Sequence, residues 1–266
     1  MIRICIFLLV SLSMQIATAR AEIITSIPSS VTYSPKAFWG AVMEEFYGSY
    51  DKRLKCWIGK GDSGNLCMRP HLLSSISDNG AVTHYVAIAG YAITPEGGQA
   101  DCHACSGKLG LIILRPQGDR LTLVARNSLA EDAGSWGEAP SEEAFRVVRL
   151  GQGNYGWLME FGFTGQGYTE GGVAVFGAVG DKIVDMGFIP THTDNGGTCG
   201  DGLGVCYGHS YEILTDPLQT DAPFGDLLAR KVESTRPNAP AMVRVTFSQD
   251  ELRYVAPEEL EAVLGN

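Results

Sequence analysis

The chain lacks the local motifs that mark several large classes of catalytic site. It contains no H-E-x-x-H segment, which disfavours a zinc metalloprotease, and no G-x-S-x-G turn, the usual sign of an α/β-hydrolase nucleophile. It has no glycine-rich loop between a strand and a helix, so a nucleotide-binding α/β fold is also disfavoured. A hydrolase would therefore need catalytic residues dispersed along the chain.

Basic residues are also scarce. The 266-residue chain carries 20 Lys and Arg against 30 Asp and Glu, a net charge of −10. Nucleic-acid binding depends on clustered Lys and Arg, and the sequence has no basic patch, so we expect no nucleic-acid partner. After the first residues there is no run of about 18 apolar residues, and we therefore expect no membrane span.

The N-terminal residues follow the order of a secretory signal peptide. Arg3 precedes a short apolar run at 4–10, and A-x-A cleavage patterns follow just before residue 22. We predict a signal peptide over 1–21 and a periplasmic or secreted protein. Once Arg3 and Arg20 are removed from the totals, 18 basic residues remain against 30 acidic ones, a net charge of −12.

Cysteine usage agrees with export. Cys5 lies in the predicted signal peptide, and the other cysteines form three pairs that are close in sequence. These are Cys56, Cys67, Cys102, Cys105, Cys199 and Cys206. We predict disulfides between nearest neighbours, with exchange between the first two pairs left open. Residues 22–266 are long enough for a single β-rich domain, which the disulfides would staple.

The pattern of apolar residues predicts a mainly β fold with two helices. Apolar residues recur every three to four positions over 35–51, after a Ser34 cap, which indicates an N-terminal amphipathic helix. A short C-terminal helix is expected over 257–264, with Gly265 as its stop. We expect an antiparallel, hairpin-rich sandwich, with a small propeller-like meander as the alternative. The predicted hairpins pair 109–114 with 121–125, 145–150 with 155–163, 173–176 with 182–186, and 242–247 with 252–255.

The segment Cys102-His103-Ala104-Cys105 is the sharpest short motif. Redox-active dithiols place C-x-x-C at a strand-to-helix junction, and many zinc sites combine two such motifs. Here the motif leads into an apolar strand at 109–114, and no second C-x-x-C exists. A structural disulfide is the favoured interpretation, while His103 beside the thiols keeps a redox role open.

A glycine-rich segment, residues 194–208, contains the third cysteine pair and has a histidine at either side. We take His192, Asp194, Asp201 and His209 as candidate binding residues, because imidazoles and carboxylates suit a metal ion or general-base chemistry. The spacing does not fit an EF-hand loop, so a stapled turn is favoured and no metal is predicted. A loop stiffened by a disulfide binds a partner with a smaller ordering cost.

Aromatic residues alternate with glycines over 155–168. Trp157, Phe161 and Phe163 have odd numbers and would lie on one face of a strand. Core packing is the default for such a face, but an exposed aromatic strip would suit a carbohydrate or peptide ligand. We take Trp157 and Tyr168 as further candidate binding residues.

Two classes of function stay open. The first is a non-enzymatic binding protein of the bacterial envelope, of the inhibitor or immunity type, with a protein, peptide or carbohydrate ligand and no cofactor. Predicted export, acidic charge and a disulfide-stapled β scaffold favour this class. The alternative is an exported enzyme, either a thiol-disulfide oxidoreductase at Cys102 and Cys105 or a hydrolase without a local motif.

Overall fold

The fold is described from a computed structural model of the chain. The described residues are 23–61, 64–100, 102–127, 131–200, 204–218 and 221–264. The predicted signal peptide (1–21), Asp201 and Gly265 lie outside them. Within the described residues, no helix is both long and apolar enough to cross a membrane.

The predicted mainly β class is confirmed. The first part of the chain forms β1 (Ile23–Pro28), β2 (Tyr50–Asp51), β3 (Cys56–Gly61), β4 (Gly64–Asp78), β5 (Ala81–Ala92), β6 (Gly107–Gln117), β7 (Arg120–Arg126) and β8 (Glu131–Ala133). The second part forms β9 (Phe145–Gly151), β10 (Asn154–Gly165), β11 (Tyr168–Val179), β12 (Lys182–Asp194), β13 (Gly208–Thr215), β14 (Leu227–Ser234), β15 (Met242–Ser248) and β16 (Arg253–Val255). The helices are η1 (Ser29–Tyr33), α1 (Pro35–Tyr47), η2 (Glu142–Ala144) and α2 (Glu258–Leu264).

Hydrogen bonds connect these strands into a large mixed sheet. Its main path runs β16-β15-β14-β13-β12-β7-β6-β5-β4-β3-β2, and β11, β10 and β9 branch from β12 in that order. The parallel junction between β7 and β12 pairs Arg126 with Lys182. Because this junction is so short, the two halves of the sheet are held together mainly by side-chain packing.

The segments predicted to pair lie in neighbouring antiparallel strands: β6 with β7, β9 with β10, β11 with β12, and β15 with β16. The predicted set does not include the other antiparallel pairs of the sheet, among them β4 with β5 and β10 with β11. In the second of these, residues from Gly156 to Gly165 pair with residues from Gly177 back to Tyr168. The resulting β10–β11 ribbon carries the candidate site.

Helix α1 begins where the sequence predicts and ends earlier. Ser34 caps it, since the Ser34 hydroxyl accepts a hydrogen bond from the Ala37 N–H. The predicted end at Asp51 is wrong, because Gly48 adopts a positive φ of 87° and the chain turns away. Glycine adopts such a positive φ at little cost because it has no Cβ. Tyr50 and Asp51 then form β2.

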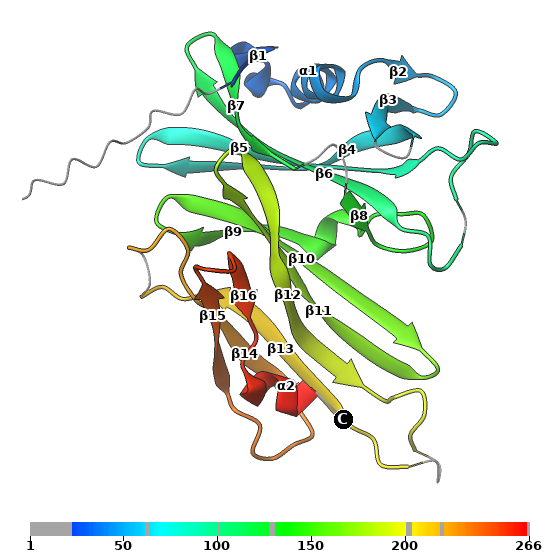
Figure 1. The fold of residues 1–266 in the computed structure, drawn as a ribbon, viewed down its shortest axis with the longest axis vertical. Coiled ribbons are helices and arrows are strands. Elements are labelled where there is room, and N and C mark those ends of the chain that lie inside the picture. Colours follow the sequence, from blue (N-terminus) through cyan, green and yellow to red (C-terminus); the bar gives the residue numbers. More distant parts are fainter. Residues whose placement is uncertain are drawn as a thin grey trace, which may run out of the picture.

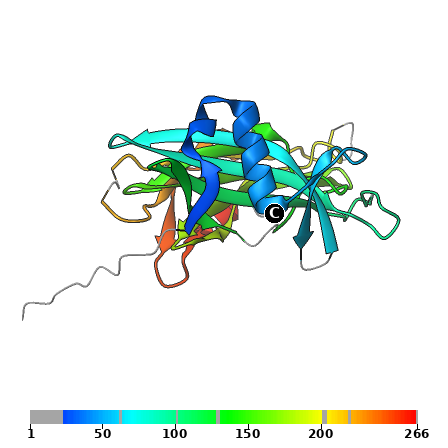
Figure 2. The ribbon, with the colours of Figure 1, turned by 90° about the horizontal axis from the view of Figure 1, so that it is seen from above.

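Core clusters divide the molecule into layers (Figure 1). Helix α1 covers one face of β4–β7, where Phe38 and Val42 pack with Val86. Figure 2 shows the helix lying across these strands. The opposite face of β5 and β6 packs on β9–β12 through residues such as Tyr85 and Trp157. The far face of β9–β12 packs on β13–β15 and α2.

Side chains alternate between these clusters along the central strands. In β10, Trp157 and Met159 belong to the cluster between the two sheet segments, whereas Leu158 belongs to the cluster next to α2. In β5, Val86 belongs to the cluster under α1, whereas Ala87 belongs to the cluster between the two sheet segments. Successive strand residues point to opposite faces, so an apolar run buries both faces of a strand. In the first half of β10, the odd-numbered residues therefore face β5 and β6.

All six predicted disulfide cysteines are paired with their nearest neighbours in sequence. The Cα–Cα distances are 5.4 Å for Cys56–Cys67, 5.1 Å for Cys102–Cys105 and 5.0 Å for Cys199–Cys206. Exchange between the first two pairs, which the sequence left open, does not occur in this structure. The first pair is buried, whereas Cys102 and Cys206 are exposed.

Candidate functional site

One face of β10 changes from buried to exposed along its length. Trp157 and Met159 are 0% and 6% exposed, whereas Phe161 and Phe163, further along the same face, are 41% and 50% exposed. Figure 1 shows the β10–β11 ribbon extending away from the strands above it. The apolar face of the ribbon therefore continues past the layer that covers its beginning.

Phe188 of β12 joins this face because of a β-bulge. Phe176 pairs with Asp185 and Ala174 with Phe188, so β12 has one more residue than β11 between these pairs. The extra residue reverses the alternation and places the Phe188 ring, 47% exposed, on the uncovered face. A Cβ on Gly172 would come within 2.3 Å of this ring, so glycine is needed for the ring to lie against β11.

The three rings line a groove with a volume of about 390 Å³. Its apolar walls are Phe161, Phe163, Phe188, Pro190 and Leu264, and we call it the aromatic groove. Leu264 comes from α2, so the end of the chain supplies one wall and β10–β12 supply the other. Ligand pockets typically measure about 300–1,000 Å³, which places the groove at the size of one or two bound side chains.

The polar lining of the aromatic groove is acidic. Glu170 of β11 and Glu261 of α2 line it, together with His192 and Thr193. Glu170 lies directly opposite Phe163 in the β10–β11 ribbon, so the carboxylate and the ring share a face. Both glutamates are exposed, and among the described residues neither forms an ion pair.

The Cys102–Cys105 loop lies next to the groove. The Cys105 N–H donates to the Cys102 carbonyl at 2.9 Å, which closes a tight turn. The His103 ring of this loop contacts Phe163 edge-on with a centroid distance of 5.4 Å and Trp136 with a distance of 5.1 Å. Trp136 is itself 54% exposed. The aromatic surface therefore extends from the groove across this disulfide loop.

The Cys199–Cys206 loop packs against the turn that joins β10 and β11. The Gly197 N–H donates to the Gly167 carbonyl at 3.0 Å. Gly167 has a positive φ of 84°, and a Cβ there would lie 2.6 Å from the Thr198 side chain, so both conformation and space require glycine. Two disulfide loops that are remote in sequence thus flank the same end of the ribbon.

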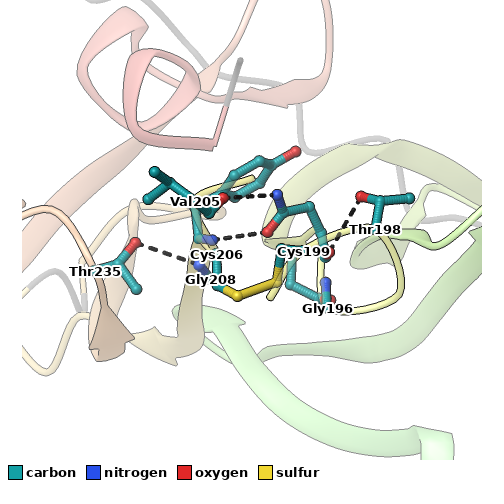
Figure 3. The surroundings of a disulfide bond; sticks show 10 residues. Gly196, Thr198, Cys199, Val205, Cys206, Gly208 and Thr235 are labelled. Atoms are coloured by element: carbon teal, nitrogen blue, oxygen red, sulfur yellow. Dashed lines mark hydrogen bonds between the residues drawn. A yellow bond between two sulfur atoms is a disulfide. The ribbon is translucent and has the colours of Figure 1, made fainter. Parts of the chain in front are cut away.

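Asn195 holds the two ends of the second loop together. Its side-chain amide donates to the Val205 carbonyl at 3.0 Å, and its side-chain oxygen accepts from the Tyr207 N–H at 2.7 Å. The Thr198 hydroxyl donates to the Asn195 carbonyl at 3.2 Å. Figure 3 shows these bonds beside the disulfide. Asn195 is 8% exposed, so its polar atoms depend on these partners.

Replacement of Asn195 by alanine is expected to lower the free energy of unfolding by about 1–3 kcal/mol, since two backbone groups lose their partners. Urea denaturation measures the change, and amide hydrogen exchange at Tyr207 should accelerate. Asn195→Asp keeps the acceptor for the Tyr207 N–H but loses the donor to Val205, so an intermediate loss is expected. Unchanged stability and exchange in Asn195→Ala would mean that the disulfide alone holds the loop.

The candidate histidines His192 and His209 do not converge. In the β12–β13 pair, His192 lies opposite Ser210, and His209 lies opposite Thr193. The two histidines therefore occupy adjacent positions along the strand pair, and their side chains point to opposite faces of the sheet. His209 is 2% exposed, and its Nδ1 lies 2.6 Å from the Ser234 hydroxyl. Burial lowers the pKa of His209, which favours a neutral ring in a structural role.

Asp194 fixes the start of the disulfide loop. Its carboxylate accepts from the Gly196 N–H at 2.8 Å, and its other oxygen lies 2.9 Å from His192 Nε2. The Gly196 hydrogen bond, followed by the one from His192, lowers the pKa of Asp194. The fourth candidate of this group, Asp201, lies outside the described residues. In the described part of the chain no three His, Cys, Asp or Glu residues are grouped to hold a metal ion.

Trp157 lies in the core, and we do not retain it as a ligand contact. Its side chain is fully buried, and its ring meets Tyr85 edge-on with a centroid distance of 5.4 Å. Tyr168 is 45% exposed and lies opposite Gly165 at the end of the ribbon, outside the lining of the groove. Of the five candidate binding residues that the structure describes, His192 alone lines the aromatic groove.

Sequence reasoning missed Glu170, Phe188 and Glu261. A signal for Glu170 was present, because Gly165-Gln166-Gly167 is a turn sequence that would pair Phe163 with Glu170. No local pattern connects Glu261 with a strand about 90 residues earlier. The chain matches no protein-family model, no curated protein and no solved structure. Its function is therefore argued from the chemistry of the groove.

Proposed function

We propose that this chain is an exported, non-enzymatic binding protein of the bacterial envelope, of the inhibitor or immunity type, whose ligand covers the aromatic groove. One observation carries the proposal: Phe161, Phe163 and Phe188 remain about half exposed, although Trp157 and Met159 at the start of the same face are buried. Contiguous exposed apolar patches on folded proteins commonly mark binding sites.

The apolar area is large enough to support binding. Covering three half-exposed rings would remove roughly 250 Å² of apolar surface from water, worth about 6 kcal/mol before the costs of association. Both disulfide loops contact the β10–β11 ribbon, through His103 and Gly197, and so restrict its motion. A restricted site loses less conformational entropy when a protein, peptide or carbohydrate ligand binds.

We further propose that residues 22–266 form a single domain of the sandwich type that is exported after removal of residues 1–21. The face-to-face packing of β5 and β6 on β9–β12 favours a sandwich over a propeller-like meander. Three disulfides are typical of a periplasmic or secreted protein.

The binding role is tested by retention on immobilised protein. We expect the wild type to retain a component of the periplasmic or culture-supernatant fraction, and the double variant Phe161→Ala/Phe163→Ala to lose it. Tyr33→Ala is the matched control, since Tyr33 is 92% exposed and lies in η1, next to α1. Equal retention by wild type and double variant would exclude the groove as the binding site.

A thiol-disulfide oxidoreductase is the second candidate, favoured by the exposure of Cys102. Exchange would reduce the Cys102–Cys105 disulfide to two thiols while two thiols of a partner protein become a disulfide. The strand β6 that follows at Gly107 offers no helix N-terminus to stabilise a thiolate. Thiol counting after mild reduction separates the candidates: selective release of two thiols from this pair favours exchange, and three resistant disulfides exclude it.

A further inference from the structure

The side chains with a full charge that line the aromatic groove are carboxylates. Glu170 and Glu261 line it, and no Lys or Arg of the described residues does. Arg146 lines a neighbouring pocket that shares Phe161 and Glu170 with the groove, and it donates to the Ile213 carbonyl at 2.7 Å. Arg236 donates to the Ala262 carbonyl on α2, and the exposed Arg253 lies beside Gly187, next to Phe188. The groove therefore combines aromatic rings with carboxylates that have no counter-ion in the lining.

The hydrogen-bonding capacity of the groove is also one-sided. His192 and Thr193 are its only side-chain donors among the described lining residues, and Thr193 is 4% exposed. A sugar needs several donors and acceptors arranged around its hydroxyl groups, whereas an ammonium or guanidinium group only donates. Carboxylate acceptors beside aromatic faces therefore match a ligand with an ammonium or guanidinium group.

We infer that the aromatic groove binds the lysine or arginine side chains of a basic peptide segment in a partner protein. The cation would lie over the faces of Phe161, Phe163 or Phe188, attracted by the ring quadrupole, and would pair with Glu170 and Glu261. The net charge, −10 for the full chain and −12 without residues 1–21, would steer such a partner towards the protein. The inference rests on the proposed function and names the chemistry of its ligand.

Fluorescence anisotropy with labelled synthetic peptides tests the inference. The probe is a decapeptide of alternating arginine and leucine, and the matched control has glutamate in place of each arginine. Maltohexaose, added as a competitor and titrated separately by calorimetry, represents a neutral carbohydrate. We expect the wild type to bind the arginine peptide, to ignore the other two, and to lose affinity as ionic strength rises.

Variants assign the binding to the groove. Phe163→Ala and Phe163→Leu are expected to weaken arginine-peptide binding about fivefold or more, the leucine variant showing that the ring itself is needed. Glu170→Gln/Glu261→Gln is expected to weaken binding about tenfold. Glu44→Gln, an exposed carboxylate on α1, and Tyr33→Ala are the matched controls and should bind like the wild type. Melting temperatures of all variants verify folding.

The outcomes separate this inference from the proposed function. Absence of arginine-peptide binding by the wild type overturns the inference, as does an equal loss of affinity in Glu44→Gln and in the groove glutamate variants. Binding of maltohexaose or of the glutamate peptide that depends on Phe163 also overturns it, but leaves the binding role in place. The proposed function fails separately, if the double phenylalanine variant retains the same partners as the wild type.

Discussion

Replacement of Trp157 by alanine is expected to lower the free energy of unfolding by about 3–5 kcal/mol. The side chain is fully buried between the two sheet segments, against Tyr85 and near Phe176. This cluster carries much of the contact between the halves of the sheet, because the β7–β12 junction pairs a single residue of each strand. Alanine would leave a cavity at that contact. Chemical denaturation followed by far-ultraviolet circular dichroism measures the loss.

Phe163→Ala is the matched control on the same strand and the same face. Phe163 is half exposed, so its removal is expected to change the free energy of unfolding by about 1 kcal/mol or less. The two variants should therefore dissociate stability from binding: Trp157→Ala is expected to lose stability, whereas Phe163→Ala is expected to weaken the proposed ligand binding. Equal destabilisation by both variants would contradict the burial gradient along β10.

The burial gradient explains how far the sequence could predict this site. Alternation correctly places Trp157 and Phe163 on one face of β10, but it contains no information on where the covering strands end. That boundary depends on packing of β10 against β5 and β6, which lie about 70 and about 50 residues earlier in the chain, and no local pattern encodes such packing. The sequence alone therefore does not distinguish the buried Trp157 from the exposed rings of Phe161 and Phe163.

The same distinction holds for the rest of the fold. The mainly β class follows from apolar runs and turn signals, as over 81–93, where β5 occupies Ala81–Ala92. The end of α1 was missed because Tyr50 continues the helical spacing, yet the backbone at Gly48 turns the chain. The position of Phe188 was beyond prediction, since one extra residue in β12 reverses its face.

Removal of the Cys56–Cys67 disulfide is expected to be the second most damaging change. The two residues are 11 apart, and the loop-entropy model assigns about 3 kcal/mol to closing a loop of that length. Both cysteines are also fully buried, against Tyr91 and the partly buried Ile58. The variant Cys56→Ala/Cys67→Ala therefore loses the constraint and some packing, so we expect a loss of about 3–4 kcal/mol in urea denaturation.

Cys102→Ala/Cys105→Ala is the matched control, because its disulfide closes a loop of separation 3 and Cys102 is exposed. The same model assigns about 2 kcal/mol to it, with no cavity to add. If Cys102→Ala/Cys105→Ala lowered the free energy of unfolding more than Cys56→Ala/Cys67→Ala did, the core around Tyr91 would contribute less to stability than its burial implies. The expected order has a consequence under reducing conditions. Reduction of the exposed Cys102–Cys105 disulfide should leave the fold intact, whereas loss of the buried Cys56–Cys67 disulfide should weaken the edge of the sheet that β2 and β3 form.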